Sequence, residues 1–482
     1  MVFSDLFFLF AFIPAFALLY LLGTLIDKKC LPAVAGEASC VVRNSVLVVF
    51  SLLFYAWGEP MYVFLMLGSV LINFIAGRII DRQQQHRKAA LAVGVTVNIL
   101  ILATCKYLGF FATLLNDMGL PVPVPQIALP IGISFYTFQS ISYLVDVYRK
   151  EAHAQKRYID LLLYISMFPQ LIAGPIVRYD TVAREINHRH ASSSDVAEGI
   201  YRFMLGLGKK VIIANQLSTI ATQFLADGFS QLTTAGAWVG ILAFTFQIYF
   251  DFSGYSDMAI GIGRCLGFHF KENFDHPYCS RTVTEFWRRW HMSLGSFFRD
   301  YVYIPLGGNR RHQWFNIAVV WALTGFWHGA AWNFLLWGCY FGVLLVIEKL
   351  VILKIQRYIP APVMHIYLLF IVVFGWGLFY FDDMSRYFQF VPTLFGGGHE
   401  GAFVIAKSAV MDKFWIWIAA IAFAMPIRKW TGMLAAKVLG EGTARCEAVV
   451  MTGRLVISLA LLVLSVALLV GATNNPFLYT RF

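Results

Sequence analysis

Charged residues are scarce in this chain of 482 residues. Asp, Glu, Lys and Arg make up 13% of it, about half the share of a typical soluble protein, whereas 59% of the residues are hydrophobic. A water-soluble fold of this size needs more charge to cover its surface. The composition therefore excludes a soluble protein and predicts that much of the folded surface faces lipid.

Cysteine patterns that hold metals or disulfide frameworks are lacking. The seven cysteines include no Cys-x-x-Cys pair and no Cys–His spacing of the zinc-site kind, so we expect no metal site and no disulfide framework. No basic residue precedes the first apolar run, residues 1–26, and this run is too long for a signal peptide. We expect it to be retained as the first membrane span.

Apolar segments of about 20 residues, the length that crosses a bilayer, recur from end to end. They predict an all-α polytopic membrane protein of eleven or twelve helices, forming a single integral membrane domain over residues 1–482. The candidate spans are residues 6–26, 44–57, 61–80, 89–112, 127–148, 158–177, 203–225, 236–263, 315–347, 363–381, 403–425 and 451–472.

Basic residues are dispersed over short loops, so the net charge of +11 favours anionic lipid over nucleic acid as its partner. Two basic clusters, residues 78–88 and 149–157, bracket a pair of spans. The loop between these spans, residues 113–126, has no Lys or Arg. The positive-inside rule predicts cytoplasmic clusters, an extracytoplasmic loop and an extracytoplasmic N-terminus.

Two segments of the C-terminal half depart from a simple series of spans. In residues 281–303, four apolar side chains fall on one helical stripe, which predicts an amphipathic helix at the interface or dipping into it. These are Phe286, Trp290, Leu294 and Phe297. Residues 315–347 hold no charged side chain and would extend about 50 Å as one helix, against a bilayer core of about 30 Å. This run must tilt steeply or break, and Gly325 and Gly329 mark a place for the break.

His328 is the first candidate for catalysis, because it lies within this uncharged run between the two glycines. An ionisable residue at membrane depth is costly and is a functional candidate by default. Imidazole can take a proton from an attacking hydroxyl and return it to a leaving thiolate near neutral pH. The alternative is a neutral histidine whose ring nitrogens are satisfied by neighbouring helices.

Polar residues elsewhere have both structural and functional interpretations. His291 ends the run WRRWH and, taken alone, is an ordinary interfacial histidine. Arg288 and Arg289 either anchor lipid headgroups or hold the phosphates of a nucleotide-bearing acyl donor. Asp251 and Asp257 are six residues apart, not on one helical face, which favours separate polar partners over an acid/base pair. In residues 167–177, Pro169 and a Gly-Pro pair predict a broken helix.

Several separated motifs in the C-terminal half resemble one known family. They are TEFWRRWH at residues 284–291, RDY at 299–301, PLGGNR at 305–310 and TGFWHG at 324–329, with further likeness at residues 1–4, 129–148, 173–175, 249–261 and 475–482. These motifs resemble the membrane-bound O-acyltransferase (MBOAT) superfamily. Within it they look like the bacterial alginate O-acetyltransferase (AlgI-like) branch, and the likeness covers nearly the whole chain.

The resemblance implies a ring of tilted helices around a thinned central funnel, with His328 catalytic and His291 close to it. It implies acetyl-CoA as a cytoplasmic donor rather than a tightly bound cofactor, and we expect this donor along Trp287, Arg288, Arg289 and Trp290. It also implies a bacterial inner-membrane location and a periplasmic partner that passes the acetyl group to a polysaccharide. The polymer stays open among alginate, acetylated cellulose, another exopolysaccharide and peptidoglycan.

A transporter or a non-catalytic scaffold is the competing class, since many spans, a broken helix and buried carboxylates suit it equally. A transporter should show a repeated topology between its halves, and the sequence shows no such repeat. A scaffold would not need His328.

Overall fold

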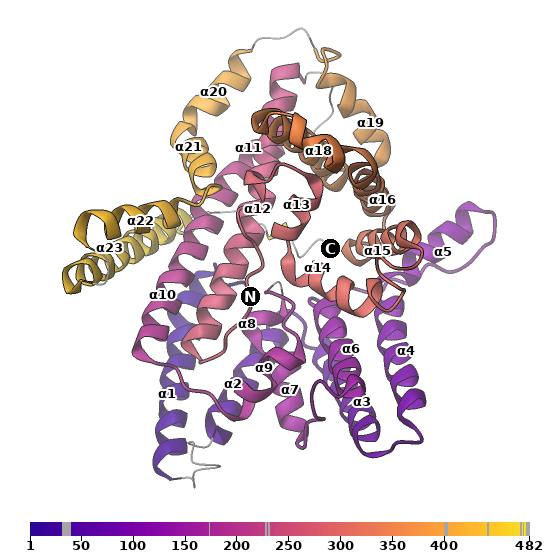
Figure 1. Cartoon of the computed structure of the whole chain (residues 1–482), viewed down its shortest axis with the longest axis vertical. Coiled ribbons are helices and arrows are strands. Elements are labelled where there is room, and N and C mark those ends of the chain that lie inside the picture. The colour runs from indigo at the N-terminus through magenta and orange to yellow at the C-terminus, as the bar shows by residue number, and fades with distance from the viewer. Residues whose placement is uncertain are drawn as a thin grey trace. The chain divides into compact units, whose positions relative to one another are not determined.

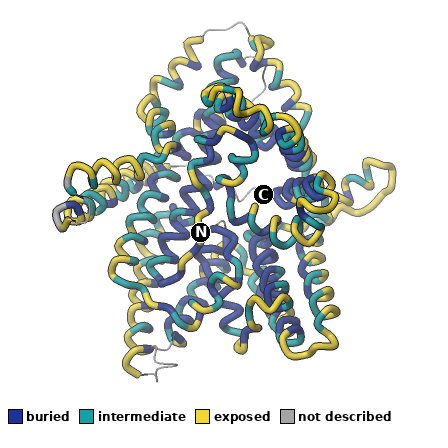
Figure 2. The backbone as a smooth tube through the Cα atoms, in the orientation of Figure 1, coloured by how far each residue is buried: buried dark blue, intermediate teal, exposed yellow. Residues whose placement is uncertain are grey.

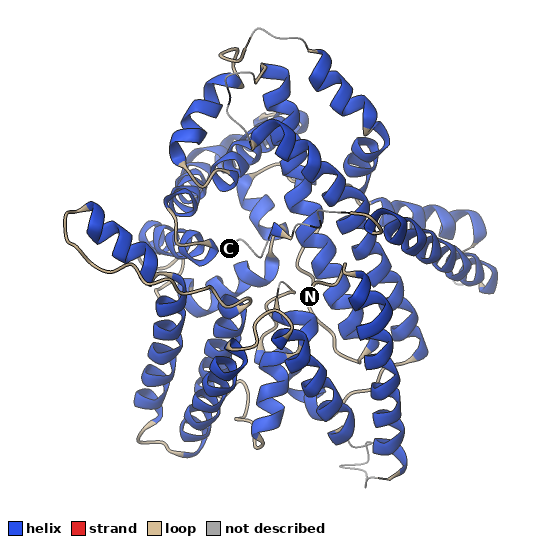
Figure 3. Ribbon diagram, turned by 180° about the vertical axis from the view of Figure 1, so that it is seen from behind, coloured by secondary structure: helices blue, strands red, loops and turns tan. Residues whose placement is uncertain are grey.

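The computed structural model describes residues 1–30, 40–172, 174–226, 229, 232–399, 403–440, 443–472, 475 and 477–478. Helices make up 77% of it, and no strand occurs among the described residues (Figure 3). The predicted all-α fold class is confirmed.

The chain divides into two compact units. The first comprises residues 1–203 with 256–271, and the second comprises residues 204–255 with 272–482. The chain passes from one unit to the other three times, within α10 (Ser193–Gly208), within α12 (Thr234–Cys265) and between residues 271 and 272. Figure 1 labels both helices. The single domain expected over residues 1–482 stays a prediction.

The first unit is built around α6, whose side chains are buried along almost its whole length. Helices α3, α4, α7 and α9 pack against it. Besides parts of α10 and α12, its helices are η1 (Phe8–Phe12), α1 (Ile13–Lys29), α2 (Val41–Ala56), α3 (Tyr62–Arg82), α4 (Arg87–Lys106), α5 (Leu108–Asp117), α6 (Ile133–Arg149), α7 (Tyr158–Ser166), α8 (Phe168–Leu171) and α9 (Tyr179–Asn187).

A buried arginine ties distant segments of the first unit together. The Arg189 guanidinium donates to the Asn44 side chain at 2.6 Å, to the Tyr20 hydroxyl at 3.0 Å and to the Leu266 carbonyl at 3.1 Å. A buried charge is tolerated when its donors are satisfied in this way. Arg189 therefore has a structural role.

The second unit has an aromatic core, and its helices α15 and α16 pack against each other. Its helices are η2 (Lys209–Ala214), α11 (Asn215–Leu225), η4 (Pro277–Cys279), α13 (Val283–Arg289), α14 (Met292–Phe298), η5 (Arg299–Tyr303), α15 (Gln313–His328), α16 (Trp332–Ile347), η6 (Glu348–Ile352), α17 (Leu353–Ile355), η7 (Gln356–Tyr358), α18 (Ala361–Tyr380), α19 (Met384–Thr393), α20 (Val404–Asp412), α21 (Phe414–Phe423), α22 (Ile427–Leu439) and α23 (Ala444–Leu469). The remaining parts of α10 and α12 belong to it as well.

Seven helices of the described residues are long and apolar enough to cross a membrane, and α2 and α21 are shorter apolar helices. In α23, only 11% of the apolar window is buried (Figure 2). An exposed apolar surface of this kind is stable in lipid. The multi-pass membrane character is confirmed, whereas the number of eleven helices and their ring around a funnel stay predictions. The seven are Phe8–Lys29, Tyr62–Arg82, Arg87–Lys106, Thr234–Cys265, Trp332–Tyr358, Ala361–Tyr380 and Cys446–Leu469.

Of the two alternatives expected for residues 315–347, a steep tilt or a break, the structure shows the break. Helix α15 ends at His328, and α16 begins at Trp332. The two helices approach closely, because a Cβ atom at Gly325 would lie 2.4 Å from the Phe334 carbonyl oxygen. Only glycine permits this approach.

The single amphipathic helix expected over residues 281–303 is wrong. The chain forms α13 and α14, separated at His291, whose backbone is left-handed with φ of 46°. The four stripe residues named above are all buried, so the apolar pattern was correct although the helix is broken. Periodicity alone does not reveal this break, because it depends on bonds to a distant loop residue, Asn273.

Several other predicted spans have different ends, because apolar composition does not mark where backbone hydrogen bonding stops. Three of the predicted spans each contain two helices: residues 89–112 hold α4 and α5, residues 158–177 hold α7 and the short α8, and residues 403–425 hold α20 and α21. Residues 127–148 are helical only from Ile133. Residues 203–225 belong to a helical stretch that begins at Ser193. The broken helix expected around Pro169 is confirmed, since Pro169 lies at the start of α8.

Candidate active site

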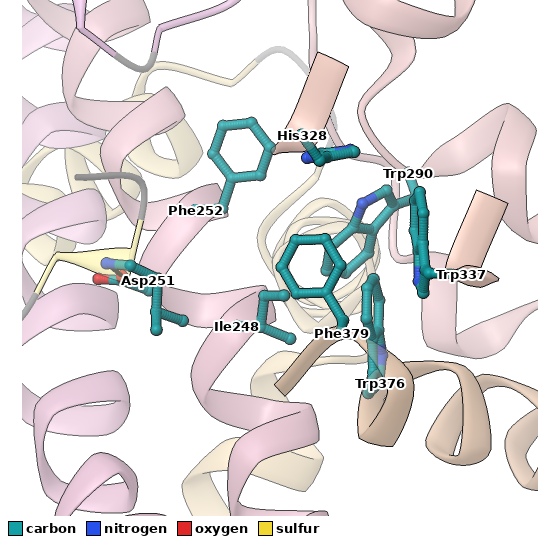
Figure 4. Close-up of a pocket in the computed structure, with 9 residues that line it drawn as sticks. Ile248, Asp251, Phe252, Trp290, His328, Trp337, Trp376 and Phe379 are labelled. Carbon is teal, nitrogen blue, oxygen red and sulfur yellow. Dashed lines mark hydrogen bonds between the residues drawn. The ribbon is translucent and has the colours of Figure 1, made fainter. Parts of the chain in front are cut away.

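A small cavity in the second unit has His328 in its wall. The cavity volume is about 20 Å³, enough for one water molecule. Figure 4 shows the rings that surround it. The lining residues are Ile248, Asp251, Phe252, Trp290, His328, Trp337, Trp376, Phe379 and Leu478.

His328 is held between aromatic rings at the C-terminal end of α15. Its ring lies edge to face with Trp337, at 5.0 Å between centroids, and with Phe379, at 5.2 Å. The residue is 7% exposed. Such packing restricts the rotamer of the imidazole.

His291 lies one side chain behind the cavity wall. Its ring contacts Phe252 at 4.6 Å and Trp327 at 5.7 Å, and Trp327 in turn contacts His328 at 4.9 Å. The structure therefore brings both predicted histidines to the same tryptophan. Burial lowers the pKa of His291 to about 3, so this imidazole is neutral at physiological pH.

The two tryptophans expected at the donor have different surroundings. Trp290 lines the cavity and packs on Trp376 at 4.7 Å. Trp287 does not line the cavity; its ring packs against Trp321 at 4.9 Å and Phe341 at 4.8 Å. Of the two, Trp287 packs in the aromatic core and Trp290 lines the cavity.

The two arginines lie outside the cavity wall. Arg289 forms an ion pair with Glu285 at 2.9 Å, one turn away on α13. Arg288 is exposed and lies close enough to Lys349 for their positive charges to interact. Of the two, Arg288 keeps more of its charge available to an anionic partner.

The two aspartates of α12 each have a cation of their own. Asp251 pairs with Lys210 at 2.6 Å and accepts a hydrogen bond from the Leu478 backbone at 2.9 Å. Asp257 pairs with Arg202 at 2.9 Å. Separate polar partners are confirmed for both carboxylates, as the spacing predicted.

Three residues that support the site have no clear sequence signal. Asn273 contacts His291, and Lys210 neutralises Asp251. Glu348 accepts hydrogen bonds from the first two backbone amides of α13, that of Val283 at 2.7 Å and that of Thr284 at 2.6 Å. Glu348 follows an apolar run directly, where a charged residue ordinarily indicates the membrane interface. In the structure it is fully buried.

A protein-family model, "MBOAT, membrane-bound O-acyltransferase family", matches residues 132–388, which are more than half of the chain. The chain belongs to this family. The region of this membrane-bound O-acyltransferase that matches the family model contains both histidines and Glu348. It also contains the cavity-lining residues from Ile248 to Phe379. It is therefore an acyltransferase, and the expected family is confirmed.

Relatives of this acyltransferase carry related names. It is 40% identical over 409 residues to "Probable alginate O-acetylase AlgI" of Pseudomonas aeruginosa, covering 83% of this chain and 75% of the relative. The Azotobacter vinelandii protein of the same name is also 40% identical, over 83% and 79% of the two chains. A "Peptidoglycan O-acetyltransferase" of Helicobacter pylori is 35% identical over 336 residues, which cover 63% of this chain and 64% of that one.

Proposed function

We propose that this acyltransferase takes an acetyl group from cytoplasmic acetyl-CoA and delivers it for O-acetylation of an extracytoplasmic polysaccharide, alginate or a related exopolysaccharide such as cellulose. The proposed location is the inner membrane of a bacterium. The observation that carries the proposal is the buried His328 in the wall of a small aromatic cavity, at the break between two apolar helices.

His328 is the proposed general base. It would remove the proton of an attacking hydroxyl as the new oxygen–acyl bond forms and the sulfur–acyl bond breaks. The same imidazole would return the proton to the departing thiolate, so the histidine ends the reaction unchanged. The bilayer separates a donor made inside from hydroxyls outside by about 30 Å of hydrocarbon, so a reactive histidine between the two faces would solve this problem.

The cavity size supports a short acyl group. A cavity that holds about one water-sized group suits a short acyl chain such as acetyl better than a long one. The coenzyme would then lie outside this cavity during transfer. Trp290 would contact the acetyl group, and Arg288, with Lys349 nearby, would hold the phosphates at the surface.

The proposed polymer and the proposed partner protein are inferred from the proteins that this chain resembles. The alginate O-acetylases match a larger share of this chain, at higher identity, than the peptidoglycan O-acetyltransferase does. This difference favours an exopolysaccharide over peptidoglycan as the acceptor. A periplasmic acetyltransferase partner would receive the acetyl group at the outer face, and the chain would contact the polymer directly or through that partner.

Membrane vesicles that contain the protein test the proposal. With labelled acetyl-CoA on the cytoplasmic side, wild-type vesicles should transfer label to polysaccharide or to the partner outside, and His328→Ala vesicles should not. If wild-type vesicles transfer no label from acetyl-CoA although the partner and the polymer are present, the proposed function is wrong. Equal transfer by the His328→Ala protein would favour a transporter or scaffold, which does not need this imidazole.

A further inference from the structure

Asn273 joins the break between α13 and α14 from a distant loop. Its side-chain oxygen lies 3.2 Å from the Ser293 backbone nitrogen, 2.8 Å from the Ser293 hydroxyl and 3.2 Å from His291 Nδ1. Its backbone carbonyl accepts from the Met292 amide at 2.9 Å. Asn273 is 1% exposed, so these bonds form away from water.

The backbone amide of Ser293 determines which end of the Asn273 carboxamide faces it. A backbone N–H can only donate, so the atom opposite it must be the carboxamide oxygen. A nitrogen there would place two donors against each other. The Ser293 hydroxyl can donate to the same oxygen.

The position of this oxygen determines the tautomer of His291. An unprotonated Nδ1 would set its lone pair against the lone pairs of the Asn273 oxygen, so Nδ1 must carry the proton and donate. In the neutral ring the remaining lone pair is then on Nε2, on the side away from Asn273. The ring itself packs on Phe252, a cavity-wall residue, and on Trp327 beside His328.

We propose that Asn273 is a positioning residue that holds His291 as the Nδ1-protonated tautomer, so that the ring packed between Phe252 and Trp327 keeps one orientation beside the cavity wall. This role rests on the proposed function, whereas the tautomer itself does not. A purely structural Asn273 would only close the helix break and would leave the tautomer of His291 unaffected.

Nitrogen-15 NMR of histidine side chains tests the tautomer directly. The full-length protein is labelled at its histidines and solubilised in detergent, and the signal of His291 is identified by its loss in His291→Gln. Wild type should show Nδ1 protonated and Nε2 unprotonated. Asn273→Asp keeps oxygen acceptors and should keep this pattern, whereas Asn273→Leu keeps the volume, removes the acceptor and should lose it. An Nε2-protonated His291 in the wild-type protein would overturn the proposal without any variant.

Acetyl transfer in vesicles tests the consequence for activity. Asn273→Leu should lower transfer per inserted molecule by at least about tenfold, part of the roughly hundredfold or more that a positioned proton-transfer group contributes. In a His291→Gln background the same substitution should cause no further loss, because Asn273 acts through His291. Equal losses in both backgrounds would overturn the proposal.

Ser293→Ala is the matched control, since it removes one hydroxyl bond to the same oxygen and leaves the backbone amide in place. It should keep the tautomer and most of the transfer, and loss of the tautomer in this variant would contradict the role assigned to Asn273. Failure of wild-type vesicles to transfer acetyl would refute the proposed function and leave the NMR result to decide the tautomer.

Discussion

The Lys210 ammonium lies 2.6 Å from the Asp251 carboxylate, and both residues are only 2% exposed. This pair joins η2 to α12 next to the cavity, and Asp251 also holds the backbone of Leu478. Because burial strips both charges of water, each depends on the other. The acidic group of the cavity wall, Asp251, is therefore neutralised by Lys210 from outside the wall.

We expect Lys210→Met and Asp251→Asn each to destabilise the protein by roughly 3–5 kcal/mol, because the remaining charge stays buried without its counter-ion. The double variant should recover part of this loss. Thermal unfolding of the detergent-solubilised protein measures all three. If the double variant loses as much stability as the two single variants together, the two charges do not stabilise each other and the prediction is wrong.

His328→Ala should lower acetyl transfer at least about a hundredfold, the contribution of a positioned general base. It should leave the amount of inserted protein unchanged, since the substitution adds no volume to the packed site. His399→Ala is the control, because His399 is exposed and does not line the cavity. Transfer per inserted molecule is the measurement, and near-normal transfer by His328→Ala would refute the assignment.

Glu348→Gln should destabilise the N-terminal end of α13. The carboxylate accepts from the Val283 and Thr284 amides and from the Thr284 hydroxyl at 2.5 Å, and a neutral amide offers one oxygen in place of two. We expect a loss of about 1–3 kcal/mol in stability, the usual cost of unsatisfied buried groups. Thr284→Ala removes only the hydroxyl and should cost less. Thermal unfolding of both variants decides this, and equal stability of Glu348→Gln and wild type would exclude the role.

Arg288→Gln should raise the acetyl-CoA concentration needed for half-maximal transfer more than Arg289→Gln does, because Glu285 already neutralises Arg289. Added salt should weaken donor use by the wild type, since exposed charges are screened. Transfer in vesicles across a range of acetyl-CoA measures both effects. Two curves that superimpose on the wild-type curve would leave the arginines as lipid anchors.

Cysteines introduced at Gln84 and Asp117 should react with impermeant reagents from opposite sides of the membrane, with Asp117 outside. Both positions are exposed, and Asp117 is preferable to Asn116, whose side chain makes two hydrogen bonds to Val122. The experiment needs a cysteine-free background, since Cys30 and Cys339 are exposed. Labelling of both positions from one side would reverse the predicted orientation.

Local sequence patterns predicted part of the fold and the site correctly. The uncharged run with Gly325 and Gly329 predicted a steep tilt or a break, and the break places His328 at the end of α15. The stripe containing Phe286 and Trp290 predicted burial but not the interruption at His291. That interruption requires a left-handed residue and bonds to Asn273, and neither is visible in apolar periodicity.

The sequence by itself determined the membrane class, the helical fold and the family, because apolar length and motif chemistry are properties of contiguous residues. It also named His328 and His291 as the candidate pair. Only the tertiary structure decided that both rings contact Trp327, that Lys210 neutralises Asp251 and that Asn273 holds His291. The physical reason is that these contacts join segments far apart in the chain, and their energies arise only when packing excludes water from them.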